Sequence, residues 1–388
     1  GALIGHNLRG YLGDSLFFNG VKQLLSQNKY GNLNANQFRD QLTAITGYNL
    51  NSFFDDWIFQ PGYAQLGIDS MEVVVTPLPE KTVTVGISQR QRAAIHAFTN
   101  IPFTITYFHE SGMHETRSFV YTNQDAAFTT QIPFTPEYAV INYNDEVLLG
   151  TTSNEVEITQ TGPLDLKRAL MKLNVVNHSD TSLLRVEHNW AGPEGKNPMG
   201  FKLSSSRYWR IMGNLSPSFD ATANLTYNSL AQNGGLDADL LSHSEDSLLL
   251  LFRNDSRDPW LEYPFYQKNI LNNSNNGFGR MELSKVLVGE YVFANGVSSV
   301  GIEERKAAKV NVKIYPNPAD SILKIETKKL KEDVSFFIFN AQGLLVAQGL
   351  IEKHSGKSIH EISTNKLSAG AYILSINNST SATFIVER

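Results

Sequence analysis

The spacing of apolar residues changes near residue 65 of this 388-residue chain, and that change limits the folds open to it. Up to Tyr63 the large apolar side chains recur every three or four residues, which is the period of an amphipathic helix. From Leu66 onward they alternate with polar residues, which is the period of a strand with one buried face. We therefore predict a multidomain, mainly β protein that begins with a helical lobe.

The predicted lobe, residues 1–65, contains four helices. Their boundaries are predicted from a stop at Gly13, caps at Asp14 or Ser15, at Asn34 with Gln37 and at Asn49, a left-handed C-cap at Gly47, and an end at Pro61-Gly62. The last helix carries large aromatic side chains on one face. We expect these side chains and the turn that follows to be structural anchors: Phe53, Phe54, Trp57, Pro61 and Gly62.

Three β-sandwich domains of Ig-like type are predicted after the lobe. Short alternating segments bounded by prolines and glycines predict one sandwich at residues 66–152 and a second all-β domain at 153–300. A charged stretch at 301–309 predicts a linker, and residues 310–388 predict a third, small sandwich.

Composition excludes several classes of function. The formal net charge is −5, and the chain has neither a basic stripe nor a glycine-rich phosphate loop, so we expect no nucleic-acid partner. The chain contains no cysteine, which excludes disulfides and thiolate chemistry. The longest apolar run, residues 248–252, is far shorter than the ~20 residues that a membrane span needs, so we expect no transmembrane segment.

Some polar and aromatic groups allow both a functional and a structural interpretation. His109 and His114 lie five residues apart, not the four that place two zinc ligands on one helix face, and we interpret them as part of a hairpin tip. Residues 89–92, Gln-Arg-Gln-Arg, are interpreted as a solvated loop rather than a binding patch.

The domain at 153–300 holds two more such groups. Four aspartates could supply oxygen ligands to calcium, but no loop motif spaces them, and we interpret them as surface turns: Asp237, Asp239, Asp255 and Asp258. Six aromatic residues could form a platform that stacks on sugars or peptides, and we favour core packing for them: Trp190, Trp209, Trp260, Tyr263, Phe265 and Tyr266.

Two stretches of the chain resemble known families. The first comprises, in order, Gly1-Ala2-Leu3, His6-Asn7-Leu8-Arg9, Leu12-Gly13-Asp14 with Phe17, Gly47-Tyr48-Asn49-Leu50, Phe53-Phe54-Asp55-Asp56-Trp57 and Gln60-Pro61-Gly62-Tyr63. These blocks resemble the end of the catalytic domain in zinc aminopeptidases of the gluzincin clan, the aminopeptidase N-like family. The resemblance implies that the zinc-binding H-E-x-x-H helix, a further glutamate ligand and a catalytic tyrosine lie upstream of Gly1.

From that resemblance we expect no catalytic and no metal-binding residue in this chain, which alone should be inactive. Zinc is expected in the upstream catalytic domain, where it would activate water, and peptides are the expected substrates of the full-length enzyme.

The second stretch lies at the C-terminal end. It comprises Val312-Lys313-Ile314-Tyr315-Pro316-Asn317-Pro318-Ala319, then residues 336–340 with Gly343, then Leu367-Ser368-Ala369-Gly370-Ala371-Tyr372-Ile373-Leu374, and finally residues 383–388. These blocks resemble the C-terminal sorting domain of the type IX (Por) secretion system, although Glu387-Arg388 departs from the lysine-rich end usual in that family. The resemblance implies a partner in the type IX secretion machinery and export through the periplasm and outer membrane to the cell surface or medium. The expected signal residues are Pro316, Asn317, Pro318, Gly343, Gly370 and Tyr372.

Two functions stay open at this point. The chain is the C-terminal, non-catalytic portion of an exported zinc aminopeptidase, or it is a surface-displayed binding or adhesion protein that retains a peptidase-derived helical lobe. An intact H-E-x-x-H motif upstream would favour the first.

Overall fold

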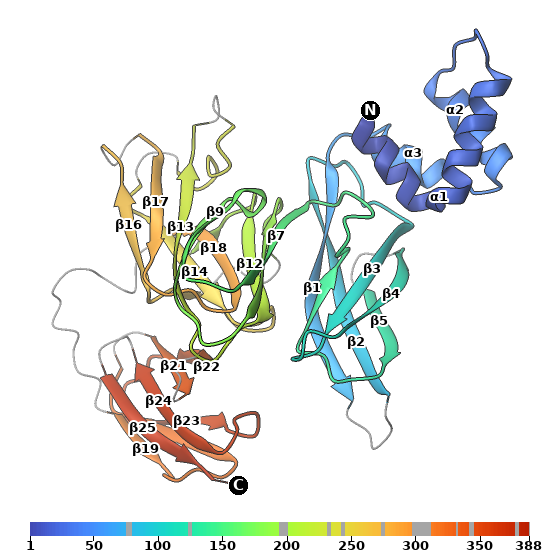
Figure 1. Cartoon of the computed structure of the whole chain (residues 1–388). Helices are drawn as coiled ribbons and strands as arrows, with labels where there is room; N and C mark the ends of the chain where they lie inside the picture. The colour runs from blue at the N-terminus through green and yellow to red at the C-terminus, as the bar shows by residue number, and fades with distance from the viewer. Residues whose placement is uncertain are drawn as a thin grey trace. The chain divides into compact units, whose positions relative to one another are not determined.

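The protein is described by a computed structural model that covers residues 1–74, 80–122, 126–193, 201–230, 234–241, 245–272, 276–296, 312–330, 333–340, 345–376 and 380–387. The chain divides into two compact units (Figure 1). Unit 1 comprises Gly1–Thr152 with His188–Glu194, and unit 2 comprises Ser153–Glu187 with Gly195–Arg388. Within the described ranges, no helix has the length and apolar character needed to cross a membrane.

Unit 1 begins with three helices, α1 (Ala2–Gln27), α2 (Ala35–Thr46) and α3 (Asn51–Trp57). The start of α2 has the predicted capping box. The Asn34 side chain accepts a hydrogen bond from the Gln37 amide at 2.9 Å, and the Gln37 side chain accepts one from the Asn34 amide at 3.0 Å. Gly47 ends α2 in the predicted left-handed conformation, with φ +72°.

The prediction of four helices is not confirmed, because α1 continues past the expected stop at Gly13. Gly13 leaves helical geometry, with φ +71° and ψ 162°, but it does so as a kink within one helix. The Arg9 guanidinium spans the kink and donates to the Asp14 carboxylate at 2.6 Å. Asp14 therefore pairs with a side chain on the other side of the kink.

Six antiparallel strands complete the main part of unit 1. They are β1 (Tyr63–Val74), β2 (Lys81–Arg92), β3 (Ile101–Phe108), β4 (His114–Tyr121), β5 (Ala126–Ile132) and β6 (Tyr138–Ile141). They form the sheets β1-β2-β5 and β4-β3-β6. One apolar core joins residues of both sheets, such as Val85 and Ile105, to helical residues such as Leu42 and Phe53. Helices and sandwich therefore share a core.

Residues 89–92 correct the prediction of a solvated loop, because they belong to β2. Gln89 and Arg90 are buried. Arg90 fits because Gly67 on β1 leaves the space, and a Cβ at Gly67 would lie 1.6 Å from its guanidinium. The Arg90 guanidinium donates to Gln65 and Asp69, so its charge is paired inside the sandwich. By contrast, His109 and His114 flank the β3–β4 turn, as predicted, with the His109 amide bonded to the Met113 carbonyl.

The first part of unit 2 is a sandwich of two sheets. Its strands are β7 (Thr151–Ile158), β8 (Gly162–Leu166), β9 (Met171–Asn177), β10 (Ser182–Asn189), β11 (Lys202–Leu203), β12 (Tyr208–Asn214), β13 (Asp220–Asn228), β14 (Leu248–Arg253), β15 (Leu261–Glu262), β16 (Tyr266–Ile270), β17 (Phe278–Leu283) and β18 (Gly289–Asn295), with a 3-10 turn at Lys167–Ala169. One sheet has the order β15-β14-β18-β12-β10-β7 with β11 on β18, and the other has the order β16-β17-β13-β9-β8.

Strand β14 explains the longest apolar run of the sequence. Leu248, Leu250 and Phe252 face the core between the two sheets, whereas Leu249 and Leu251 belong to a second apolar cluster on the opposite face. A strand that is buried on both faces needs no polar alternation.

Seven strands form the C-terminal sandwich. They are β19 (Val312–Tyr315), β20 (Ile322–Thr327), β21 (Val334–Asn340), β22 (Leu345–Ile351), β23 (Ser358–Ser363), β24 (Gly370–Ile376) and β25 (Thr380–Val386). The sheets β19-β20-β23 and β22-β21-β24-β25 enclose a core that includes Leu323, Phe336 and Leu374. The described residues thus form a mainly β protein, in agreement with the predicted class.

Candidate functional site

The last strand of the chain, β25, is the element around which the C-terminal site is built. On one side it pairs with β24 along its whole length, from Gly370 opposite Val386 to Ile376 opposite Thr380. On the other side it meets residues 317–319, which precede β20. The predicted signal residues at the two ends of this sandwich therefore come together at one strand.

Asn317 pairs with β25 through its side chain. Its Oδ1 accepts a hydrogen bond from the Ile385 amide at 2.9 Å, and its Nδ2 donates one to the Thr383 carbonyl at 3.2 Å. Ala319 continues the pairing with its backbone, since its amide donates to the Ile385 carbonyl at 2.7 Å and its carbonyl accepts from the Glu387 amide at 2.9 Å. We call residues 316–319 the clasp.

Pro316 and Pro318 flank Asn317 within the clasp. Proline has no backbone N–H, so neither residue can donate to a strand. The backbone bends at residues 316–318, and the peptide bonds before both prolines are cis. The bend turns the Asn317 side chain, rather than its backbone, toward β25.

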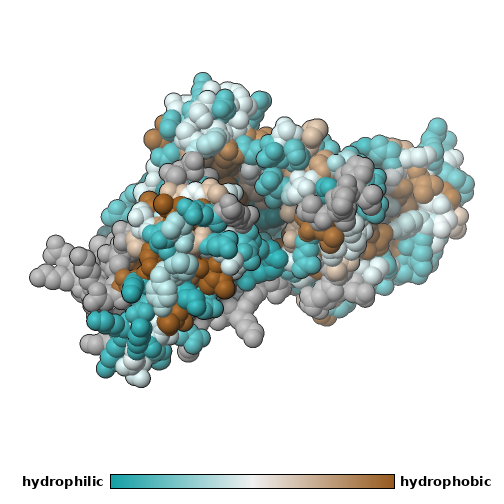
Figure 2. Space-filling model, turned by 90° about the horizontal axis from the view of Figure 1, so that it is seen from below, coloured by the Kyte–Doolittle hydropathy of each residue, from teal (hydrophilic) through white to brown (hydrophobic). Residues whose placement is uncertain are grey.

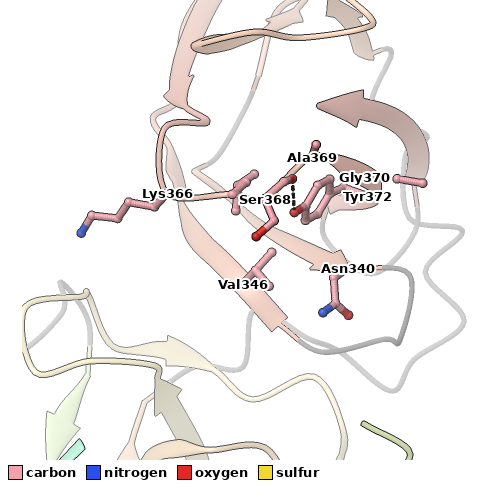
Figure 3. Close-up of a pocket in the computed structure, with 9 residues that line it drawn as sticks. Asn340, Val346, Lys366, Ser368, Ala369, Gly370 and Tyr372 are labelled. Carbon is pink, nitrogen blue, oxygen red and sulfur yellow. Dashed lines mark hydrogen bonds between the residues drawn. The ribbon is translucent and has the colours of Figure 1, made fainter. Parts of the chain in front are cut away.

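Tyr372 and Gly370 lie where β24 begins. The Tyr372 ring is buried and stacks on Phe384 of β25, with ring centroids 5.5 Å apart. Its hydroxyl donates to the Ser368 carbonyl at 2.7 Å, the bond drawn in Figure 3. Gly370 has φ +158° and opens onto empty space, while Gly343 lies outside the described residues.

A hollow of about 520 Å³ opens beside these residues, as Figure 3 shows. It is lined by Asn340, Val346 and residues 366–372. Of the lining side chains, Lys366 and Tyr372 are titratable, and the Lys366 chain extends away from Tyr372 in the view. This lining offers a concave shape and hydrogen-bonding groups.

Both outer faces of the C-terminal sandwich expose apolar side chains, and one of them also carries ion pairs. The sheet with β20 and β23 carries ion pairs, Lys324 with Glu361 at 2.8 Å and Lys357 with Glu326 at 2.9 Å. The hydrogen bond from Lys357 lowers the pKa of the Glu326 carboxyl. The sheet with β20 and β23 also exposes Ile322 and Ile359, at 40% and 47%, and the other sheet exposes Ile373 and Ile385, at 42% and 47%. Figure 2 shows such apolar residues, in brown, scattered among polar ones on one face of the molecule.

The predicted anchors lie in unit 1, where they join α3 to the sandwich. Phe53 and Phe54 are buried, and Trp57 is 9% exposed. The Trp57 indole donates to the Tyr11 hydroxyl at 3.0 Å and packs edge-on against Phe98, with centroids 4.9 Å apart. These side chains therefore connect α1, α3 and the loop between β2 and β3.

Three polar side chains, whose contacts the sequence did not predict, hold this same loop in place. Gln89 both accepts from the Phe98 amide and donates to the Phe98 carbonyl, each at 2.8 Å. Gln60 accepts from the amides of residues 95 and 96 at 3.1 Å, and Asp56 accepts from the Thr99 amide at 2.7 Å. Burial raises the pKa of the Asp56 carboxyl. In the sequence, the only indication of this role was that Gln60 lies directly before the predicted turn at Pro61-Gly62.

The aspartates considered as calcium ligands do not form a cation site. Asp237 is fully buried, which raises its pKa, and both its oxygens are bonded, to the Arg207 guanidinium and to the Asn228 amide. The surface-turn interpretation is therefore wrong for Asp237. Among the described residues, no group of three or more His, Asp or Glu side chains could hold a metal ion.

Three of the aromatic residues considered as a stacking platform pack in the interior of unit 2, as predicted. Trp209, Trp260 and Tyr263 are at most 3% exposed, so their rings cannot serve as a surface platform. Arg207 lies over the Trp209 ring and Arg253 over the Trp260 ring, which places the guanidiniums beside these indoles.

Comparison with known families identifies the C-terminal sandwich. Residues 313–387 match the family model of the secretion system C-terminal sorting domain. The predicted sorting domain is thereby confirmed, and the chain is a type IX-secreted protein of the cell surface or the extracellular space.

Two further comparisons are partial. Aminopeptidase N of Lactococcus lactis subsp. lactis is 35% identical over 74 residues, which make up 19% of this chain and 8% of that protein. The structure of PorZ, a surface component of the type IX secretion system of Porphyromonas gingivalis, aligns with 82% of this chain and 45% of its own at 10% identity. Its TM-score of 0.16 is too low to indicate a shared fold.

Proposed function

We propose that this chain is the C-terminal, non-catalytic portion of an exported zinc aminopeptidase. The upstream part would hydrolyse N-terminal residues from peptides, and the type IX sorting domain would carry the enzyme out of the cell. The similarity to aminopeptidase N supports this proposal.

The observation that carries the proposal is the apolar surface of α1. Leu3, Leu16, Phe18 and Leu25 are 43–69% exposed along this one helix. Phe18 and Leu25 lie seven residues apart and thus on the same helix face. We infer that Phe18 and Leu25 on this face contact a further part of the protein. The preceding part of a catalytic domain is the partner that the sequence resemblance supplies.

Activity of the exported enzyme tests the proposal. The full-length protein, purified from the culture medium, should hydrolyse chromogenic aminoacyl amides, lose activity with a chelator and regain it with zinc. Residues 1–388 alone should be inactive in the same assay. Absence of chelator-sensitive activity from the full-length protein contradicts the proposal and leaves the adhesion alternative.

A substitution on α1 tests the packing separately. Leu25→Asp should change the free energy of unfolding of residues 1–388 by within about 0.5 kcal/mol, because Leu25 is exposed there. In the full-length enzyme the same change should cost several times more, because it would bury a carboxylate. Gln23→Asp, at an exposed position on a different side of α1, serves as the matched control. Equal effects of Leu25→Asp in both proteins would show that nothing covers this face.

A further inference from the structure

We infer that His96 and Asp56 form a proton-operated latch: a protonated His96 ring ties the loop at residues 93–100 to α3, and the neutral ring releases that tie. The loop joins β2 to β3, and α3 belongs to the helical lobe, so the latch acts between the lobe and the sandwich within unit 1. The inference does not depend on peptidase activity.

Side-chain oxygens hold the backbone of this loop. Gln60 accepts from the amides of residues 95 and 96, and Gln89 accepts from the amide of residue 98. Asp56 accepts from the Thr99 amide through Oδ2, at 2.7 Å. Opening of the loop away from α3 breaks the bond between Thr99 and Asp56, so the Thr99 amide reports how firmly the loop is held.

The Nδ1 atom of His96 lies between one donor and two acceptors. Gln60 Nε2 lies 3.4 Å from it, the Ala97 carbonyl oxygen 3.2 Å and Asp56 Oδ1 3.7 Å. In a neutral ring Nδ1 can accept a hydrogen bond from Gln60, whereas in a protonated ring it can only donate. Protonation therefore ends the contact with Gln60 and favours Ala97 and Asp56.

The two members of the latch differ in exposure. The His96 side chain is 53% exposed, so its ring can take a proton from water, whereas the Asp56 side chain is 2% exposed. Attraction to a buried carboxylate is screened less than attraction between two exposed groups. The charge on the ring should therefore hold the loop more firmly to α3.

The titratable groups around Asp56 come from α1, α3 and β2. Asp55 on α3 repels the Asp56 charge. Burial, more than the Asp56 charge, raises the pKa of the Tyr11 hydroxyl on α1. Arg92 at the end of β2 donates to the Tyr63 hydroxyl at 3.5 Å. Histidine, by contrast, is the side chain that ordinarily changes charge between about pH 5 and pH 8.

The latch should close and then open again as the pH falls. It closes when His96 takes up a proton, because the ion pair with Asp56 then forms. It opens when Asp56 takes up a proton in turn. Burial raises the pKa of the Asp56 carboxyl, against the opposing effects of the Thr99 amide and His96, so this second step comes at a higher pH than for an ordinary aspartate.

The surroundings of the protein give this latch a signal to respond to. The chain is a type IX-secreted protein of the cell surface or the extracellular space, where the pH is that of the medium. The loop presents Ile95, which is 78% exposed. The latch thus sets how firmly an apolar side chain is held at the surface of unit 1.

The test measures hydrogen exchange of the Thr99 amide in the whole chain from about pH 8 to about pH 4, corrected for the intrinsic pH dependence of exchange. In wild type, protection should rise about threefold between about pH 8 and about pH 6, the size expected for a partly exposed ion pair, and fall again toward about pH 4. His96→Gln cannot take up a proton and should show no rise. His109→Gln, at the β3–β4 turn of the same unit, is the matched control and should behave as wild type.

Two results overturn the inference directly. One is protection of Thr99 in wild type that does not change with pH. The other is a rise that persists in His96→Gln, because another group then takes up the proton.

Asp56→Asn tests the partner of the ring, since it keeps an acceptor for the Thr99 amide and loses the charge. It should also show no rise, and a rise equal to that of wild type contradicts the pair. If this variant loses protection throughout α3, the helix has unfolded, and salt on wild type decides instead. About 1 M sodium chloride should reduce the rise, because it screens the pair, and an unchanged rise overturns the inference.

Discussion

Side-chain amides in this protein repeatedly stand in for a neighbouring strand. Asn317 bonds an amide and a carbonyl of β25, and Gln89 bonds the amide and carbonyl of Phe98. Asn142 does the same with the amide and carbonyl of Val147. A carboxamide offers one donor and one acceptor, as a peptide group does, and can satisfy both groups of a buried backbone segment.

Gln89→Leu should destabilise unit 1 strongly. Leucine has a side-chain volume close to that of glutamine, but it leaves the buried Phe98 amide and carbonyl without partners. Each unpaired group should cost ~1–3 kcal/mol of unfolding free energy. Denaturant titration measures the loss. Gln131→Leu, at an exposed position of the neighbouring strand β5, should change the free energy of unfolding by less than about 0.5 kcal/mol. Similar small losses for both variants would show that water replaces the Gln89 bonds.

Trp57→Ala should cost ~3–5 kcal/mol of unfolding free energy, because it removes a large core aromatic. Tyr11→Phe should cost ~1–3 kcal/mol, because it leaves the buried indole N–H without an acceptor. The double variant should lose less unfolding free energy than the sum of the two single losses, because both substitutions remove the same hydrogen bond between Trp57 and Tyr11. A loss below about 1 kcal/mol for Trp57→Ala would contradict a core role.

At the scale of helices and strands, sequence motifs predicted the structure where the interacting residues are close together in the chain. The capping box of Asn34 and Gln37 spans three residues, and the sequence predicted it together with the Gly47 cap. At Gly13 the backbone leaves helical geometry, where the sequence predicted a break, but α1 continues beyond it as one kinked helix with the Arg9–Asp14 pair across the kink. The prediction of a solvated loop at residues 89–92 was wrong because the partners of these side chains are not their neighbours in the sequence: Gln65, Asp69 and Phe98.

The turn from α3 into β1 depends on a glycine at position 62. Gly62 has φ +86°, and a Cβ there would lie 2.2 Å from the Arg92 carbonyl oxygen. Gly62→Ala should therefore lower the free energy of unfolding by ~1–3 kcal/mol or more, from backbone strain together with the clash. Gly112→Ala, at φ +84° in the open β3–β4 turn, has no neighbouring atom within 4 Å and isolates the strain. Equal losses from both variants would show that the contact with Arg92 is harmless.

At the scale of the whole molecule, sequence motifs predicted the family of the C-terminal domain, but they did not predict contacts between residues far apart in the chain. The blocks at both ends of the sorting domain were recognised from the sequence, but their meeting at β25 was not, because Asn317 and Ile385 lie 68 positions apart in the chain. The buried pair of Arg207 and Asp237 was missed for the same reason. A charged residue such as Asp237, which the sequence places in a surface turn, can be buried because a partner far away in the chain neutralises its charge.

Removal of residues 310–388 should leave the rest of the chain folded and prevent its export. The C-terminal sandwich has its own apolar core, so its loss should remove a signal without removing packing that the other sandwiches need. Expressed in a host with the type IX system, the full precursor should reach the surface or medium, and the truncated chain should accumulate in the periplasm. The full precursor in a host without that system is the control and should be retained as well. Circular dichroism of the retained protein separates failed export from failed folding. Equal amounts of the full and truncated chains outside the cell would show that these residues do not direct export.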